Sequence, residues 1–190
     1  QLSLKPAVKQ QLSDYKVVVW ATDDTAPVAE DVSARALGVG AQLEAAGATV
    51  SYTARPEFDV VAAHENYQTL LNSAMTSGMD SEEVARMQRR ADSLDNDDSS
   101  RDALITRAAV LSHRDWIRAN GRREKIRAAW DEFFEEWDIV VCPQMATTAF
   151  VHDHQPFRER TVAVDRAHRP YFEQLFWAGL AINAYLPSTV

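Results

Sequence analysis

The chain has 190 residues, of which 46% are hydrophobic and 25% charged, and its formal net charge is −8. This composition is typical of a globular domain with a sizeable core and excludes a disordered or fibrous chain. The acidic balance, without a dense Lys/Arg tract, argues against nucleic-acid binding, which depends on neutralising phosphates with basic side chains.

The sequence also argues against a membrane protein and against a secreted one. No segment approaches the ~18 unbroken apolar residues of a membrane helix. The first twenty residues lack the basic-then-apolar order of a signal peptide. The single Cys142 excludes an internal disulfide, which favours a cytoplasmic location. The excess of Arg over Lys is typical of GC-rich bacterial genomes.

The first part of the chain has the pattern of a β-α-β unit. The apolar run at 16–20 predicts a buried strand, and the alternation at 48–53 predicts a second one. Between them, Pro27 suits the first turn of a helix and Gly47 suits its left-handed C-cap. A crossover of this length predicts that the two strands are parallel.

Helices are expected through the middle of the chain. One begins near Asp59 and is followed by a polar helix at 81–94, an acidic loop, and a helix at about 102–119. Asn120-Gly121 predicts a turn or a break. The inner face expected for the first of these helices consists of Val60, His64, Tyr67, Leu71 and Ala74.

A helix then leads directly into a strand. The large apolar residues Ile126, Trp130, Phe133 and Trp137 fall at steps of 4, 3 and 4. This spacing places them on one helix face. The apolar run at 139–142, stopped by Pro143, predicts a buried strand. A helix that feeds a buried strand is typical of an α/β domain.

The last part of the chain is expected to be irregular from Pro143 to about Asp165. A helix that is apolar nearly all round follows at 170–183, which predicts that it is buried. Residues 185–190 look like the start of a strand.

The predicted fold is therefore α/β, with helices flanking a mixed sheet whose strands lie near 16–20, 48–53, 139–142 and 185–190. We expect 1–14 to be an N-terminal extension or linker. Residues 15–190 are expected to form a single α/β domain, a fragment of a larger one.

Short motifs along the chain are ordered and spaced as in a known enzyme family. In the second half they are Asp115-Trp116, Arg122-Arg123, Trp130, Phe133-Phe134, Asp138, Pro143, Ala149-Phe150, His152, Arg160, Pro170-Tyr171, Trp177 and 186–190. In the first half they are Val17-Val18-Val19-Trp20, Asp23-Asp24, Pro27-Val28 and Glu44-Ala45-Ala46-Gly47. From Tyr15 onward, most of the chain resembles the amidase signature family of hydrolases.

The resemblance implies cleavage of carboxylic amide C–N bonds, with a small-molecule amide as substrate and without a cofactor. In that family a Ser nucleophile, a bridging Ser in a cis peptide and a Lys base perform the chemistry, and backbone N–H groups stabilise the oxyanion. A Gly-Ser-Ser-Gly-type loop is absent from this sequence. The only Ser-Ser pair, Ser99-Ser100, lies in an acidic stretch and is interpreted as a loop with a helix N-cap. We therefore predict no catalytic residue here, and an isolated chain that is inactive.

Other candidate sites have simpler interpretations. His152-Asp153-His154, with His168 further on, is a conceivable ligand set, but zinc sites need three or four ligands on a rigid frame and this triplet lies in a loop. We predict no metal site. Cys142 lies in an apolar strand, where a raised pKa and low reactivity are expected. Gly38-Val39-Gly40 lies inside a helix pattern and so is no dinucleotide fingerprint.

Two further features are interpreted as core. His64 is expected to be a hydrogen-bonded core histidine. The aromatic set Trp130, Phe133, Trp137 and Trp177 is interpreted as core in preference to a substrate pocket. The substrate-binding residues are unknown. The loop from Pro143 to Arg160 is a hypothesis for the substrate-side wall, because it follows the carboxyl end of a strand.

Three hypotheses remain open at this point. The first is a fragment of an amidase, which predicts exposed apolar patches and hence a homodimer or poor solubility. The second is a non-catalytic α/β binding or interaction module, which predicts no such patches. The third is an unrelated enzyme built on His152, His154 and Cys142.

Overall fold

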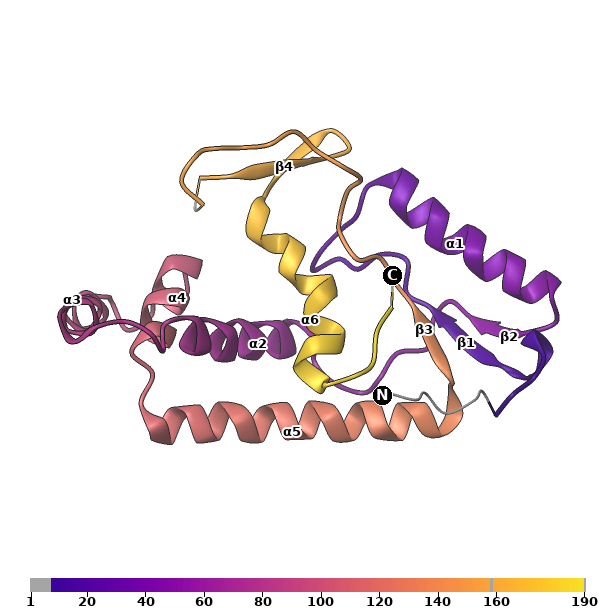
Figure 1. Ribbon diagram of the computed structural model, residues 1–190, viewed down its shortest axis with the longest axis horizontal. Helices are drawn as coiled ribbons and strands as arrows, with labels where there is room; N and C mark the ends of the chain where they lie inside the picture. Colours follow the sequence, from indigo (N-terminus) through magenta and orange to yellow (C-terminus); the bar gives the residue numbers. More distant parts are fainter. Residues whose placement is uncertain (1–7, 158, 190) are drawn as a thin grey trace, which may run out of the picture. The chain divides into compact units, whose positions relative to one another are not determined.

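The computed structural model describes residues 8–157 and 159–189, and these form two compact units. Unit 1 contains the described residues up to Glu57, Ala129–Ile182 and those from Leu186 on. Unit 2 contains Phe58–Ala128 and Asn183–Tyr185. Figure 1 shows the elements of both along the chain.

Unit 1 is built on a three-stranded parallel sheet in the order β2-β1-β3 (Figure 1). Its strands are β1 (Lys16–Val19), β2 (Thr49–Ser51) and β3 (Ile139–Val141). Val17 lies opposite Val50 on one side and Ile139 on the other. The α/β class, the positions of three strands and the parallel β-α-β unit are thus confirmed. The burial predicted for the strand at 139–142 is wrong, because Ile139 of β3 is 42% exposed. The strand predicted at 185–190 does not form within 185–189, and Val190 lies outside the described residues.

The central strand β1 is buried on both faces. Its three valines are each 1% exposed, as expected for a parallel sheet with covered faces. Helix α1 (Glu30–Ala45) lies beside β1 and β2 (Figure 1). The approach is so close that a Cβ on Gly40 would come within 2.8 Å of the Tyr52 hydroxyl. Gly47 ends the helix at φ +93°, the left-handed conformation predicted for it.

A two-stranded antiparallel hairpin caps the start of α1. The segment from Pro143 to Asp165 is irregular as predicted in the described residues up to 160, but it then forms β4 (Thr161–Val164), which pairs with β5 (Ala167–Pro170). Asp165 turns the hairpin at φ 52°, which Asp tolerates better than most residues. Its carboxylate accepts the backbone N–H of Glu30 at 3.1 and 3.2 Å. A side chain 135 residues away therefore supplies the cap that Ala29 cannot.

Large aromatic side chains fill the rest of the unit 1 core. The helix predicted at 170–183 is observed as the 3₁₀ helix η2 (Tyr171–Gln174) followed by α6 (Leu175–Ala184). Trp177 of α6 meets Trp20 edge to face, with ring centroids 6.2 Å apart. The Trp177 indole N–H donates to the carbonyl of Ala26 at 3.2 Å. Both tryptophans are fully buried, so α6 is buried as predicted.

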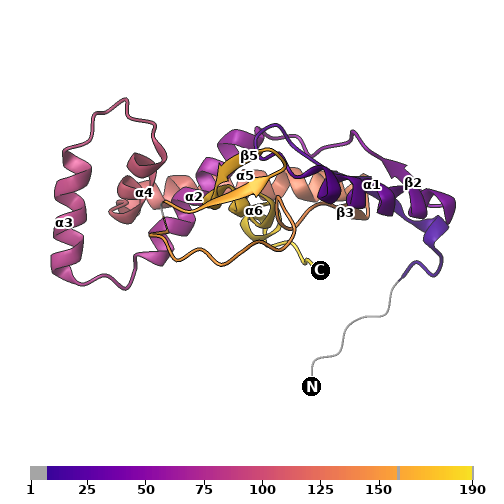
Figure 2. The same ribbon diagram turned by 90° about the horizontal axis from the view of Figure 1, so that it is seen from above.

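Unit 2 is helical. It contains α2 (Val60–Met75), α3 (Ser81–Asp92), α4 (Arg101–Ala109) and the first part of α5 (His113–Glu136), whose last turns belong to unit 1. Helix α4 contacts both α2 and α3 (Figure 2). The side chains of Asp59, Asp80 and Ser100 accept N–H groups at the starts of α2, α3 and α4.

Two predictions for these helices are wrong. The chain breaks at 110–112, and α5 runs unbroken through Asn120-Gly121. The Ser112 hydroxyl accepts the N–H of Asp115 at 3.1 Å and donates to its carboxylate at 2.6 Å. This capping starts a new helix, whereas one interior Gly costs only about 1 kcal/mol.

The buried face of α2 is also rotated from the predicted one. Its buried residues are Ala63, Asn66, Tyr67, Leu70 and Asn72, of which only Tyr67 was expected. The two asparagines can be buried because their side chains have hydrogen-bond partners. The spacing of apolar residues, on which the prediction rested, does not detect such buried polar residues. Among the described residues, no helix is both long and apolar enough to cross a membrane.

Candidate functional site

The Ser99-Ser100 pair lies in the loop before α4 and serves as a cap. The Ser100 hydroxyl accepts the N–H of Ala103 at 3.3 Å. A hydrogen bond from the Ser100 side chain is the main cause that lowers the pKa of the Asp98 carboxyl. Arg107 donates to the carbonyls of Asp95 and Asp98 at 2.7 and 2.6 Å and holds the loop closed. The N-cap interpretation is confirmed.

The loop from Pro143 to Arg160 is anchored at one end and exposed at the other. Ala146 is buried, donates its N–H to the Gln174 side chain at 2.8 Å, and accepts the N–H of Ala29 at 2.7 Å. Further along, Phe157 meets Phe172 edge to face at 4.6 Å between ring centroids. Phe150 and Phe157 stay 43% exposed. The distal loop is therefore an exposed aromatic surface.

The histidines of this loop do not assemble a metal centre. The rings of His152 and His154 contact each other edge to face, with centroids 4.6 Å apart. His168 lies on β5. Within 8–157 and 159–189, no group of three His, Cys, Asp or Glu side chains is placed to hold a metal ion.

The other two titratable candidates are both perturbed by burial. Burial raises the pKa of the Cys142 thiol, as predicted from its position at the end of β3. Burial, and then the charge of Arg101, lowers the pKa of His64 from 6.5 to about 4. A ring nitrogen of His64 lies 2.5 Å from the Gln68 side-chain nitrogen, so His64 is the hydrogen-bonded histidine expected.

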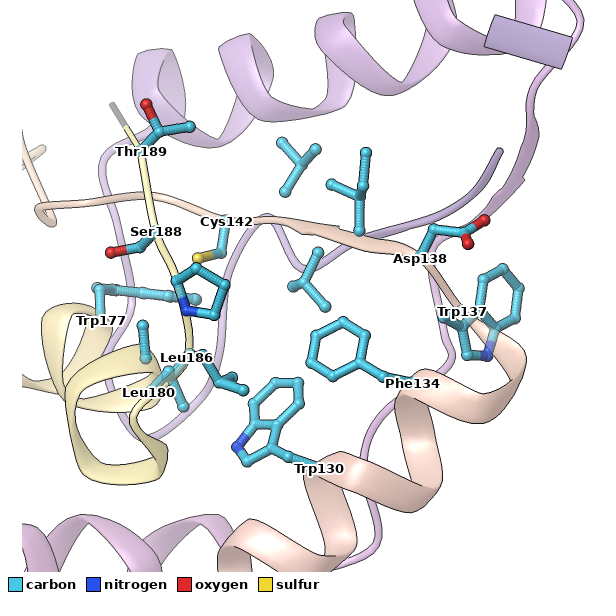
Figure 3. Close-up of a pocket in the computed structure, with 15 residues that line it drawn as sticks. Trp130, Phe134, Trp137, Asp138, Cys142, Trp177, Leu180, Leu186, Ser188 and Thr189 are labelled. Carbon is cyan, nitrogen blue, oxygen red and sulfur yellow. The ribbon is translucent and has the colours of Figure 1, made fainter. Parts of the chain in front are cut away.

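The structure adds an apolar pocket within unit 1, shown in Figure 3. Its volume is about 670 Å³. Three segments line it: the last turns of α5, the strand β3 with Cys142, and α6 with the segment that follows it. The lining residues are Trp130, Phe134, Trp137, Asp138, Ile139, Val140, Val141, Cys142, Trp177, Leu180, Ala181, Leu186, Pro187, Ser188 and Thr189.

The aromatic lining arises from helical spacing. Trp130 and Phe134 are four residues apart on one side of α5, and Trp137 follows three residues later, directly after the helix ends at Glu136. Trp130 is nonetheless only 2% exposed, and Phe133, on the neighbouring stripe, is also buried. The core interpretation therefore holds for Trp130, Phe133 and Trp177, while Trp130, Trp137 and Trp177 also line the pocket. Nothing in the sequence indicated that residues 186–189 would line the same pocket as these aromatic side chains.

Asp138 is the one carboxylate in the lining, and it is engaged elsewhere. It accepts the N–H of Lys16 at 2.8 Å and pairs with the Lys9 ammonium. Burial alone raises the pKa of Asp138, but these hydrogen bonds and the charges of both lysines outweigh it and lower the pKa. In Figure 3 its carboxylate points away from the middle of the pocket.

The fold and these sites define an α/β protein with an apolar pocket in unit 1. The family model described as Amidase matches residues 1–169. The chain therefore belongs to the amidase family, a family of amide hydrolases, as its motifs indicated. No curated protein matches the chain.

Proposed function

We propose that this chain is the framework part of an amide hydrolase and does not hydrolyse amides by itself. In the full-length parent enzyme, a Ser, a bridging Ser and a Lys would cleave a small-molecule carboxylic amide. The observation that carries the proposal is the position of Ser99-Ser100. It is the only Ser-Ser pair in a chain that matches the family over 169 residues, and it is a helix cap.

The surroundings of Ser100 are unsuited to a nucleophile. A nucleophilic hydroxyl needs a base within hydrogen-bond reach that takes its proton. The hydroxyl of Ser100 instead donates to Asp98, whose lowered pKa makes its carboxylate a weak base. Its oxygen is turned toward the N–H of Ala103.

The lysines support the same proposal. Lys9 pairs with Asp138, Lys16 belongs to β1, and Lys125 lies on α5. No hydrogen bond among the described residues joins any of these three to Ser99 or Ser100. Lys5 lies outside the described residues. A lysine base acts only within about 3 Å of the hydroxyl that it deprotonates.

The chain's own contribution to the parent would be the sheet and the wall behind the substrate. The loop 143–160 follows the carboxyl end of β3, where α/β proteins gather their sites. The two hydrogen bonds of Ala146 fix the start of this loop. We further propose a bacterial, cytoplasmic protein, supported by the Arg excess and the single cysteine.

The test is to treat the purified chain with a fluorophosphonate probe, which labels nucleophilic serines, and to measure amine release from aryl and alkyl amides. We expect neither labelling nor release above buffer, with circular dichroism showing a folded α/β chain. Labelling or hydrolysis that disappears in Ser99→Ala or Ser100→Ala would overturn the proposal. Labelling at another serine would overturn it as well.

A further inference from the structure

We propose that the pocket between α5, β3 and α6 binds a neutral small molecule with an aromatic or branched alkyl body. This inference stands on the pocket alone and does not depend on the proposed function. It concerns binding, and its test measures no hydrolysis.

Size and lining are those of a small-molecule site. The volume of about 670 Å³ falls within the range of about 300–1,000 Å³ that is typical of such sites. Trp130 of α5, Trp137 just after this helix and Trp177 of α6 line the pocket, together with aliphatic side chains of β3 (Figure 3). Stacked aromatic contacts contribute about 0.5–1.5 kcal/mol each beyond buried area.

Parts of the wall are held in place before any ligand arrives. Trp177 is fixed by its hydrogen bond to Ala26 and by its contact with Trp20. Trp130 stacks on Phe134 with ring centroids 5.5 Å apart. The N–H of Leu186 donates to the carbonyl of Ala181 at 3.0 Å, which ties the last segment to α6. A preformed wall reduces the entropy lost on binding.

The charges select a neutral ligand. No Lys, Arg or His lines the pocket, so an anion would be desolvated without a partner. Asp138 is already paired with Lys9, so a cation gains little there. Burial keeps the Cys142 thiol protonated by raising its pKa. The thiol and the hydroxyls of Ser188 and Thr189 offer one uncharged polar side for a single hydrogen-bonding group.

Two probes with nearly the same aromatic body but different charge test whether the pocket prefers a neutral ligand. N-phenyl-1-naphthylamine is neutral, and 8-anilinonaphthalene-1-sulfonate carries one negative charge. We expect the neutral probe to bind at one saturable site with energy transfer from tryptophan. The sulfonate should bind at least about tenfold more weakly, because its charge would be desolvated.

Neighbouring residues of α6 give a matched pair of variants. Ala181→Phe fills the pocket, whereas Ile182→Phe adds the same ring at a side chain that is 57% exposed and outside the lining. We expect the first variant to lose at least about tenfold in affinity for the neutral probe and the second to bind as the parent does.

The single cysteine gives an independent measurement that needs no variant. Cys142 lines the pocket, so bound N-phenyl-1-naphthylamine should slow its alkylation by N-ethylmaleimide in proportion to occupancy. This decides the question if Ala181→Phe does not fold. The proposal is overturned by absent or unsaturable probe binding, by equal affinity for both probes, by a folded Ala181→Phe that still binds, or by unprotected Cys142.

Discussion

The two units of this chain have cores of different chemistry. Unit 1 buries large rings and branched side chains, with Trp20, Trp130 and Trp177 each at 1–2% exposure. Unit 2 buries no tryptophan among its described residues; it buries small side chains such as Ala103 and Ala119, the larger Tyr67, Leu70 and Ile126, and several polar ones. Its buried polar residues are Asn66, Asn72, Thr106 and Asn183.

The difference indicates what each unit depends on. Unit 1 gains stability from apolar area and close packing, so changes of side-chain volume should matter most there. In unit 2 the buried amides of Asn66 and Asn72 are hydrogen-bonded, so its stability should depend on these hydrogen bonds and on keeping His64 uncharged. Four substitutions sharpen or break this contrast.

Trp130→Ala should have the largest effect. The side chain is 2% exposed and packs against Phe133 edge to face and Phe134 face to face. Its removal leaves a large cavity and should destabilise the fold by about 3–5 kcal/mol. Urea unfolding measures this, with Ile182→Ala as an exposed control that should stay within about 0.5 kcal/mol. A melting temperature equal to that of the parent would place Trp130 outside the core.

Gly40→Ala should come next, at about 1–3 kcal/mol of destabilisation. Its added methyl group would meet the ring of Tyr52 at 2.9 Å and the side chain of Val19 at 2.9 Å. Gly38 is the matched control on the same helix, since a Cβ there meets nothing within 4 Å. Gly38→Ala should stabilise α1 by up to about 1 kcal/mol. Equal shifts of the thermal midpoint in both variants would contradict the close packing of α1 on the sheet.

Asn66→Ala tests the polar core of unit 2. The Asn66 amide donates to the carbonyl of Ala119 at 3.1 Å and accepts from the Arg122 guanidinium at 2.9 Å. The substitution leaves the Ala119 carbonyl and the Arg122 guanidinium without these hydrogen bonds. It should lower the free energy of unfolding by about 1–3 kcal/mol. Asn96→Ala, in the exposed acidic loop, is the control. If chemical denaturation gives the same midpoint for both variants, hydrogen bonding is not what holds this unit.

His64 should make stability fall in mild acid. Its pKa is about 4 in the folded chain, against 6.5 as the ordinary value, so the unfolded state binds its proton first. The stability that depends on a neutral His64 is fully present above pH 6.5 and is lost as the pH falls toward 4. The full shift corresponds to about 3 kcal/mol, which solvent screening at this half-buried ring reduces to about 1–2 kcal/mol.

Urea midpoints across this pH range, in the parent and in His64→Gln, measure the effect. The variant should show a shallower pH dependence, while the carboxyl groups titrate alike in both. Arg101, Gln68 and Tyr67 are the polar neighbours that are kept in the comparison. Identical pH profiles would remove His64 as the acid-sensitive group.

Sequence patterns located most elements of unit 1 because their signals are local. The run Val17–Trp20 and the run ending at Pro143 are continuous and apolar, and both became strands. The β4–β5 hairpin was missed because its turn at Asp165 carries no glycine, so the usual turn signal is absent. Residues 185–189 have strand-like composition but form none, since strand formation needs a paired neighbour.

The candidate sites also separate into those with a local sequence signal and those that depend on tertiary contacts. The sequence identified Ser100 as a cap and Cys142 as a thiol with a raised pKa, because both depend on adjacent residues. It missed the pocket, which needs α5, β3 and 186–189 to meet in space. The stripe through Trp130 predicted an apolar face but not whether a core or a cavity would lie against it.

The sequence by itself determined the α/β class and the amidase-type motifs. Apolar periodicity, caps and motif spacing are properties of short segments, so they can be recognised from the sequence without a structure. Only the tertiary structure decided that Asp165 caps α1, that α5 continues through Gly121, and that an apolar pocket opens beside β3. Each of these depends on contacts between residues far apart in the chain, which local patterns do not encode.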